Sequence, residues 1–112
     1  MTECLFCSIV QGDIPADVVW RSDDVVVFRD INPVAPTHLL VIPTQHHVHA
    51  AAVAEADAAL AGSLLAAAGQ VAAQEGLTDY RLVFNTGAGA GQSVFHAHLH
   101  VIGGRPLEWP PG

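Results

Sequence analysis

Three histidines occupy alternate positions near the end of this 112-residue chain: His96, His98 and His100. Apolar residues separate them and β-forming residues flank them, so the pattern predicts a strand over residues 94–102. All three imidazole rings would then share one face, where they can attack an electrophile, carry protons or bind a metal. The opposite face should pack on the core, because it carries only apolar side chains: Phe95, Ala97, Leu99 and Val101.

Two kinds of chemistry suit this histidine face. Three neutral imidazoles can hold a catalytic metal and leave one position open for water. Alternatively, one imidazole can attack phosphorus. The preceding loop, residues 87–93 (GAGAGQS), favours phosphorus, because its backbone N–H groups, the Gln92 amide and the Ser93 hydroxyl suit phosphate oxygens. His98 is then the natural nucleophile, since the histidines on either side can carry protons or orient it.

The remaining sequence supplies elements that would support such a strand. Alanine-rich periodicity predicts one long helix over residues 53–76, and a short helix is expected over residues 4–11, ended by Gly12. Runs of β-branched or aromatic residues predict four further strands, at residues 18–20, 25–29, 38–43 and 81–85. The run at 38–43 is continuously apolar, so we expect a central, buried strand there.

Composition limits the partners of the chain. Hydrophobic residues make up 51% and charged residues 13%, which leaves little polar surface for a monomer of this size, so we expect a homodimer. The net charge of −7 and the lack of lysine argue against a nucleic-acid partner. Apolar runs are too short to span a bilayer, so we expect no membrane association and a cytoplasmic location. Residues 1–112 should form one compact domain.

The run His-Ala-His-Leu-His-Val-Ile fits the pattern of the histidine-triad (HIT) superfamily, in which apolar residues separate and follow three histidines. The chain resembles this superfamily throughout, including GDIPA at 12–16, FRDI at 28–31, APTH at 35–38 and GGR at 103–105. Its WPPG ending, which contains Trp109, is similar to the Hint branch, whose members hydrolyse purine nucleoside phosphoramidates. The resemblance implies an α+β fold: an antiparallel five-stranded sheet with one long and one short helix, continued across a two-fold dimer.

The resemblance also implies roles for individual residues. His98 would form a nucleotidyl-histidine, His100 would contact the phosphate and the scissile bond, and His38 would orient the triad or relay protons. Asp30 would bind the ribose hydroxyls, and Trp109 would approach the partner's site. The phosphate and the leaving group would be held by Asn85, Gly91, Gln92 and Ser93, and the base pocket would be lined by Leu5, Phe6, Ile9, Ile14, Phe28 and Ile31. Catalysis would need no cofactor.

Cys4 and Cys7 have the spacing of half a zinc site, and no second CxxC pair follows them. Histidines must therefore supply the other ligands, and His46, just after a predicted strand, is the leading third one. The resemblance implies His96 as the fourth, which would make a closed structural zinc site. The alternative is a pair of free thiols.

Other functions remain open at this point. A histidine at position 100 favours hydrolysis, because the nucleotidyl transferases of the superfamily resemble HxHxQ. Dinucleoside polyphosphates are the alternative substrate. A nucleotide-binding scaffold with incidental hydrolysis and a metal-dependent hydrolase are alternative functions. His47 and His49 are expected to be solvated residues beyond the end of a strand.

Overall fold

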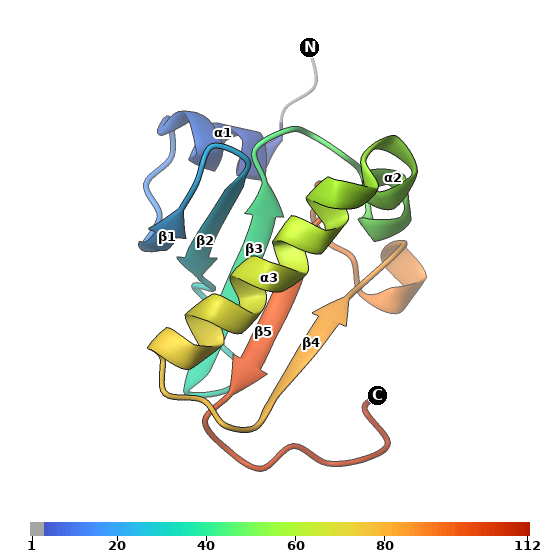
Figure 1. The fold of residues 1–112 in the computed structure, drawn as a ribbon. Helices are drawn as coiled ribbons and strands as arrows, with labels where there is room; N and C mark the ends of the chain where they lie inside the picture. Colours follow the sequence, from blue (N-terminus) through green and yellow to red (C-terminus); the bar gives the residue numbers. More distant parts are fainter. Residues whose placement is uncertain (1–3) are drawn as a thin grey trace.

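The computed structural model describes residues 4–112, and in this part of the chain five strands form one antiparallel sheet (Figure 1). The strands are β1 (Val18–Arg21), β2 (Val25–Arg29), β3 (Thr37–Pro43), β4 (Tyr80–Phe84) and β5 (Leu99–Gly103), in the spatial order β1-β2-β3-β5-β4. The helices are α1 (Leu5–Gln11), α2 (Ala50–Ala56), α3 (Ala58–Gln74) and the short 3₁₀ helix η1 (Ala88–Ala90). The predicted α+β class and five-stranded antiparallel sheet are confirmed.

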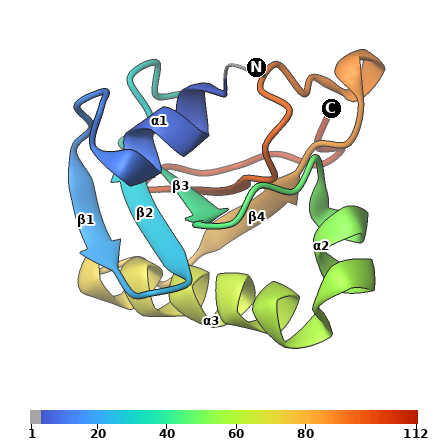
Figure 2. The ribbon, with the colours of Figure 1, turned by 90° about the horizontal axis from the view of Figure 1, so that it is seen from above.

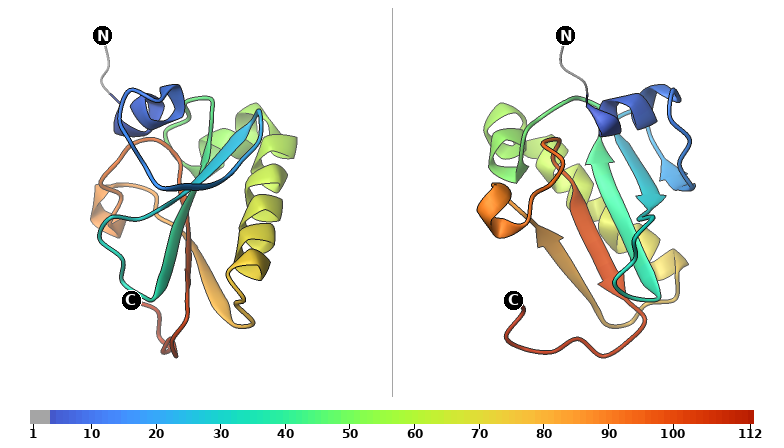
Figure 3. Two further views of the ribbon diagram at one scale, coloured as in Figure 1. Left: turned by 90° about the vertical axis from the view of Figure 1, so that its left-hand side faces the viewer. Right: turned by 180° about the vertical axis from the view of Figure 1, so that it is seen from behind.

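Two helices cover opposite faces of the sheet (Figures 2 and 3). Helix α3 lies across one face, over a core that includes Leu39, Leu64, Leu99 and Val101. Helix α1 lies on the other face, over a smaller core of Phe6, Ile9, Val26, Phe28, Leu40 and Ile42. Because both faces are covered at β2 and β3, these strands are apolar along most of their length and do not alternate.

The expected long helix over residues 53–76 is wrong in one respect: the segment forms two helices. Asp57 lies between α2 and α3 in an extended conformation, with φ −159°. Its side-chain oxygen accepts a hydrogen bond from the backbone N–H of Leu60 at 3.1 Å, which caps α3. The helix therefore begins again at Ala58, and the fold has three α-helices within residues 4–112, where one long and one short helix were expected.

The histidine strand begins later than predicted, at Leu99 instead of residue 94. Leu99 is the first residue of β5, where it pairs with Val41 on β3 and with Phe84 on β4, so residues 94–98 have no ladder partner. Side chains still alternate between the two faces of the sheet in this segment, because Ala97, like Leu99, is buried in the core beneath α3. Phe95 does not follow this pattern: its side chain is 49% exposed, contrary to the prediction that it packs in the core.

The two ends of the sheet differ in how they connect. A hairpin joins β1 and β2, and Gly12, with φ 82°, ends α1 in the left-handed conformation that favours glycine. Beyond β5, the chain runs as an irregular tail to Gly112, anchored where Arg81 donates a hydrogen bond to the carbonyl oxygen of Glu108. No helix in the described residues is long and apolar enough to cross a membrane.

Candidate active site and metal centre

Strands β3 and β5 are neighbours in the middle of the sheet, and their pairing gathers the predicted catalytic histidines. His100 on β5 lies opposite Leu40, and His38 is two residues away from Leu40 on β3, so their side chains point to the same face. The ring centroids of His98 and His100 are 5.0 Å apart, and those of His38 and His100 are 5.1 Å apart. Together with Asp30, just beyond β2, these histidines form the active-site cluster (Asp30, His38, His98 and His100).

The ring of His98 is buried and held from two sides. Its Nδ1 lies 2.8 Å from the carbonyl oxygen of His96, and because a carbonyl only accepts, Nδ1 must carry the proton. The edge-on ring of Phe6 packs against it with centroids 5.1 Å apart. The other nitrogen, Nε2, consequently keeps its lone pair, as the predicted nucleophile requires.

One main-chain contact determines which ring nitrogens of His38 and His100 carry the protons. The backbone N–H of Val34 donates to Nδ1 of His38 at 3.1 Å, so the proton of neutral His38 is on Nε2. That Nε2 donates to Nδ1 of His100 at 2.8 Å, which places the proton of His100 on its own Nε2. His100 Nε2 is buried and has no hydrogen-bond partner among the described residues. The cluster thus ends in an unpaired donor.

The electrostatics keep this pair neutral. Burial lowers the pKa of His100 to about 4, with further lowering by His98 and His38 and a partial offset from Asp30. Burial also lowers the pKa of His38, against the opposing effect of the Asp30 carboxylate, which lies 3.4 Å from His38 Nε2. At neutral pH both rings are therefore hydrogen-bonding groups without charge.

The glycine-rich loop is more closed than the sequence suggested. Backbone N–H groups of Ala90, Gly91 and Gln92 donate to carbonyl oxygens of the same loop. The Gln92 side chain is buried: its oxygen accepts from the N–H of Gly87 at 2.8 Å, and its nitrogen donates to the carbonyl oxygens of Val48 and Val94. Gln92 therefore holds the loop in shape, which corrects the expectation that its amide contacts a phosphate. The Ser93 side chain is exposed.

The residues predicted to bind the nucleotide divide into two groups. Phe6, Ile9 and Phe28 are buried against one another, whereas Leu5, Ile14 and Ile31 are exposed, the last by 90%. Asn85 is half-buried just beyond β4 and close to Gly91. Asp30 uses one oxygen to accept from the N–H of Asn32 at 2.9 Å, which fixes the turn after β2. Trp109 lies in the tail and is 82% exposed.

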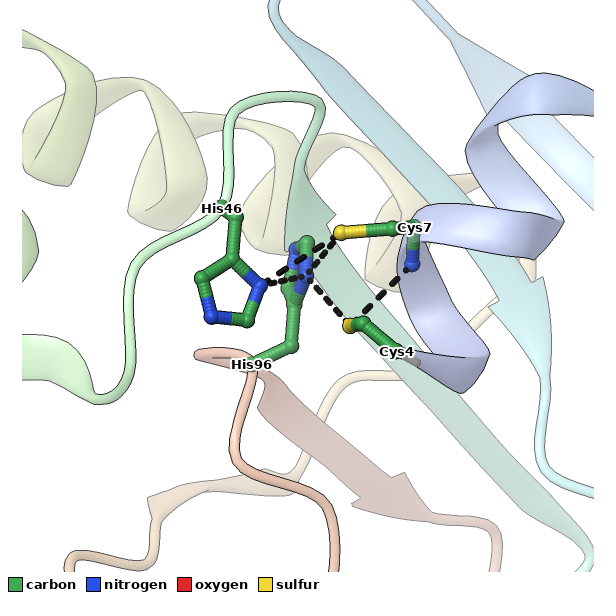
Figure 4. A group of neighbouring side chains, drawn as sticks. All are labelled: Cys4, Cys7, His46 and His96. Atoms are coloured by element: carbon green, nitrogen blue, oxygen red, sulfur yellow. Dashed lines mark hydrogen bonds between the residues drawn. The ribbon is translucent and has the colours of Figure 1, made fainter. Parts of the chain in front are cut away.

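A second cluster lies at the beginning of α1, where four predicted metal ligands converge (Figure 4). This metal cluster (Cys4, Cys7, His46 and His96) draws two residues from α1 and its cap, one from the loop after β3 and one from the segment before β5. His96 is fully buried, and its Nε2 donates to the carbonyl oxygen of Pro43 at 2.9 Å. Its Nδ1 therefore presents a lone pair to the other three residues.

The spacing of these atoms fits a tetrahedral ion. Nδ1 of His96 lies 3.2 Å from Nδ1 of His46, 3.3 Å from Sγ of Cys4 and 3.5 Å from Sγ of Cys7. Zinc with bonds of about 2.1 Å to nitrogen and 2.3 Å to sulfur sets its ligand atoms roughly 3.4 to 3.8 Å apart, so the three distances lie within about 0.3 Å of that arrangement. Burial and the adjacent Cys4 raise the pKa of the Cys7 thiol to about 11, so a thiolate there needs a cation beside it. The residues fit zinc.

The geometry argues against one shared metal on the three alternating histidines. Nδ1 of His96 faces the two cysteines, Nδ1 of His98 donates to a carbonyl oxygen, and Nδ1 of His100 accepts from His38. The three rings thus serve three different environments, and the metal-dependent hydrolase that the HxHxH spacing allowed loses its support.

Sequence reasoning missed several supporting groups. His49, expected to be solvated, caps α2 by accepting a hydrogen bond from the N–H of Ala52, and Nε2 of His47 is buried without a partner among residues 4–112. The Val34 N–H and the Pro43 carbonyl, which fix the protons of two histidines, are main-chain groups that carry no signal in the sequence. Only the position of His49 just before an alanine-rich run hinted at a cap.

An antiparallel five-stranded sheet that carries this row of histidines defines the histidine-triad class of α+β proteins. The family model of the HIT domain matches residues 11–107, and the chain belongs to that family. A HIT family hydrolase from Legionella pneumophila has 50% identity and a TM-score of 0.94, over 98% of this chain and 100% of that chain. A HIT family hydrolase from Clostridium thermocellum has 35% identity and a TM-score of 0.91, over 96% of each chain.

The same similarity extends to a curated sequence. An uncharacterised HIT-like protein from Synechocystis is 47% identical over 111 residues, which cover 98% of this chain and 97% of that protein. The similarity therefore runs through nearly the full length of both chains, including the segments that supply the active-site cluster and the metal cluster.

Proposed function

We propose that this protein is a hydrolase that cleaves purine nucleoside 5′-phosphoramidates, with His98 as the nucleophile. The observation that carries the proposal is the hydrogen bond from Nδ1 of His98 to the His96 carbonyl oxygen, because it leaves the lone pair of Nε2 free. Similar proteins named HIT family hydrolases support the reaction class. The WPPG ending, similar to that of the Hint branch, supports the substrate.

The reaction proceeds in two steps. His98 Nε2 attacks phosphorus, the bond from phosphorus to the amine nitrogen breaks, and a nucleotidyl-histidine forms. Water then attacks the same phosphorus, which releases the nucleoside monophosphate and restores the ring. The first step takes up one proton, which goes to the amine nitrogen as its bond to phosphorus breaks. The second step gives one proton back, when the attacking water becomes the hydroxyl group on phosphorus.

His38 and His100 support these steps as neutral rings. The unpaired donor at His100 Nε2 is buried, so it gains a partner when a phosphoryl oxygen arrives. His38 holds His100 in the tautomer that makes this donor available. Asp30 is assigned to the ribose hydroxyls, and Asn85, Gly91 and Ser93 to the phosphate and leaving group; Gln92 acts through the shape of the loop.

A substrate panel tests the proposal. The purified protein is assayed with adenosine and guanosine 5′-phosphoramidates of a simple amine and with dinucleoside polyphosphates of the same bases. Faster turnover of the phosphoramidates, measured as kcat/KM, is the expected result. Preference for the polyphosphates would replace the substrate assignment, and binding without turnover would replace the enzyme with a nucleotide-binding scaffold.

The metal cluster is assigned to a structural zinc ion, held by Cys4, Cys7, His46 and His96. All four protein ligands are present, so the site is closed and offers no open position for substrate. Zinc there would link α1 to the loop after β3 and to the segment before β5. Metal analysis of protein purified under reducing conditions without chelator should find about one zinc per chain; protein without zinc that also fails to take it up would reject the site.

A homodimer in the cytoplasm completes the proposal. Strand β4 is an outer strand of the sheet, and it exposes 39% of Tyr80 and 37% of Leu82. A second copy could continue the sheet there and cover these side chains, and Trp109 in the adjacent tail is exposed enough to reach it. Size-exclusion chromatography with light scattering should report a dimer at micromolar concentration, and a monomer alone would contradict this assembly.

A further inference from the structure

We infer that the metal cluster also positions the nucleophile. Cys4, Cys7 and His46 hold two neighbours, His96 and Phe6, and these two residues hold the ring of His98. The inference rests on the proposed role of His98 and on zinc binding, but it concerns the orientation and the tautomer of the ring, which are measurable without turnover.

The first connection runs through the main chain of His96. Its side chain is tied at both nitrogens, with Nε2 donating to Pro43 and Nδ1 directed at Cys4 and His46. Its carbonyl oxygen accepts the proton of His98 Nδ1 at 2.8 Å. The same peptide unit is also held through its N–H, because Ala97 donates to the carbonyl oxygen of His47, next to the ligand His46, at 2.7 Å. The direction of the carbonyl therefore depends on residues at or next to two of the metal ligands, His96 and His46.

The second connection runs through Phe6. This residue lies between the two cysteines, and its ring packs edge-on against His96 at 5.9 Å and against His98 at 5.1 Å. Helix α1 has seven residues, which is too short to be stable by itself, so its place depends on its attachments. The Phe6 ring is also held by Phe28 in the smaller core, and Cys4 and Cys7 add the restraint of the metal cluster to the side chain that covers the nucleophile.

Loss of these two restraints has a specific consequence. An imidazole without a fixed carbonyl at Nδ1 divides its proton between Nδ1 and Nε2, and the second tautomer cannot attack phosphorus. A ring that is also free to turn spends less time in line with the phosphorus–nitrogen bond. Metal loss should therefore lower kcat more than it changes KM.

The test compares wild-type protein as purified, stripped of metal by chelator, and reloaded with Zn²⁺. Long-range ¹⁵N NMR at one fixed pH reports the tautomer of His98, and kcat and KM are measured with an adenosine phosphoramidate. Metal-loaded protein should show a single tautomer with the proton on Nδ1. Stripped protein should show both tautomers and lose about 10²-fold in kcat, the loss expected for a catalytic group displaced by about 1 Å, and reloading should restore both readouts.

Two variants keep the test decisive. His46→Ala removes a metal ligand that does not contact His98, so it should behave like stripped protein. This variant replaces the stripped sample if the chelator precipitates the wild-type protein. Gly12→Ala strains the end of α1 at φ 82° but leaves all four ligands, so it should retain metal and the single tautomer. A single Nδ1 tautomer and unchanged kcat in metal-free protein would overturn the inference, as would an equal loss in Gly12→Ala. If no nucleotide is turned over by any sample, the tautomer alone decides.

Discussion

The metal cluster and the active-site cluster both contact Phe6, yet His96 in the first and His38 in the second carry their protons in opposite ways. In the metal cluster, the far nitrogen of His96 meets the Pro43 carbonyl, so the proton is there and the near nitrogen is a lone pair. In the active-site cluster, the far nitrogen of His38 meets the Val34 N–H, so the near nitrogen carries the proton. One main-chain group, a carbonyl or an N–H, thus decides whether a histidine offers a lone pair or a donor.

The same comparison explains why only one cluster suits a metal. Asp30, His38 and His100 also bring three ligand atoms close together. However, the proton on His38 Nε2 occupies the space between the rings, where Nε2 and His100 Nδ1 are 2.8 Å apart. A metal there would force the proton of His38 onto Nδ1, against the Val34 N–H. In His98, as in His96, a carbonyl oxygen fixes the proton on one ring nitrogen. The lone pair on the other nitrogen of His98 is available to attack phosphorus.

The largest expected effect comes from the lone pair at His98. His98→Asn should lower kcat roughly 10⁴- to 10⁶-fold, as expected when an enzyme loses its nucleophile. Zinc content should not change, because the His98 side chain is not one of the four ligands of the metal cluster. Single-turnover kinetics and metal analysis on the same preparation check both halves of the prediction. Turnover close to that of the wild type would remove His98 from the chemistry, and loss of zinc would mean that the two clusters are not separate.

Zinc linkage should give the next largest effect. When free zinc is held at 100 times its Kd, the folded state should gain about 2.7 kcal/mol of stability, because the unfolded chain lacks the assembled site. Urea unfolding with and without zinc measures this gain. Cys7→Ser should abolish it, whereas His38→Gln, which changes only the active-site cluster, should retain it. If zinc stabilised both variants equally, the ion would bind elsewhere.

The sequence predicted the parts of this comparison that depend on periodicity. Alternation placed Ala97, Leu99 and Val101 in the core correctly, and the continuous apolar run at 38–43 identified the central strand. The strand start was wrong because pairing with β3 and β4 stops at Leu99, a limit that neighbouring strands set. Phe95, farther from that limit than the buried Ala97, is exposed.

Local composition was less informative where one residue type serves two purposes. Asp57 is a poor residue inside a helix and a good one at its beginning, and only the structure shows that it caps α3. Gln92 has the amide expected of a phosphate ligand, yet its donors and acceptor are used by the backbone of its own loop and by Val48. Spacing and position predicted three of the metal ligands, and the resemblance to the family added His96. The tautomers of the histidines depend on the positions of Pro43 and Val34, which the sequence does not give.

A smaller effect is expected in the pH dependence of stability. The pKa of His100 is about 4 in the folded protein, below its ordinary value of 6.5. The unfolded chain therefore binds a proton there first, so stability is fully present above about pH 6.5 and falls as the pH drops toward 4. His100→Gln removes this proton site. Between pH 7.5 and 5.0 its free energy of unfolding should fall less than that of the wild type, by on the order of 1 kcal/mol, because the ring is only partly buried.

Urea unfolding at the two pH values checks this difference. His38 remains in the variant and its pKa is lowered in the same direction, so part of the pH dependence should persist. An identical fall in the two proteins would mean that the pKa of His100 is the same in the folded and unfolded states, and the lowered pKa assigned to it would then be wrong.

The smallest effect separates charge from hydrogen bonding at Asp30. One oxygen of Asp30 accepts from the N–H of Asn32, and the other lies near His38 Nε2, where its charge raises the pKa of His38. Asp30→Asn keeps an acceptor for the turn but removes the charge, so the pKa of His38 should fall further while stability at pH 7.5 changes by less than about 0.5 kcal/mol. Asp30→Ala also loses the turn bond, which should cost about 1 kcal/mol more. NMR titration of His38 distinguishes the two effects, and a rise in its pKa in Asp30→Asn would contradict the effect assigned to the Asp30 charge.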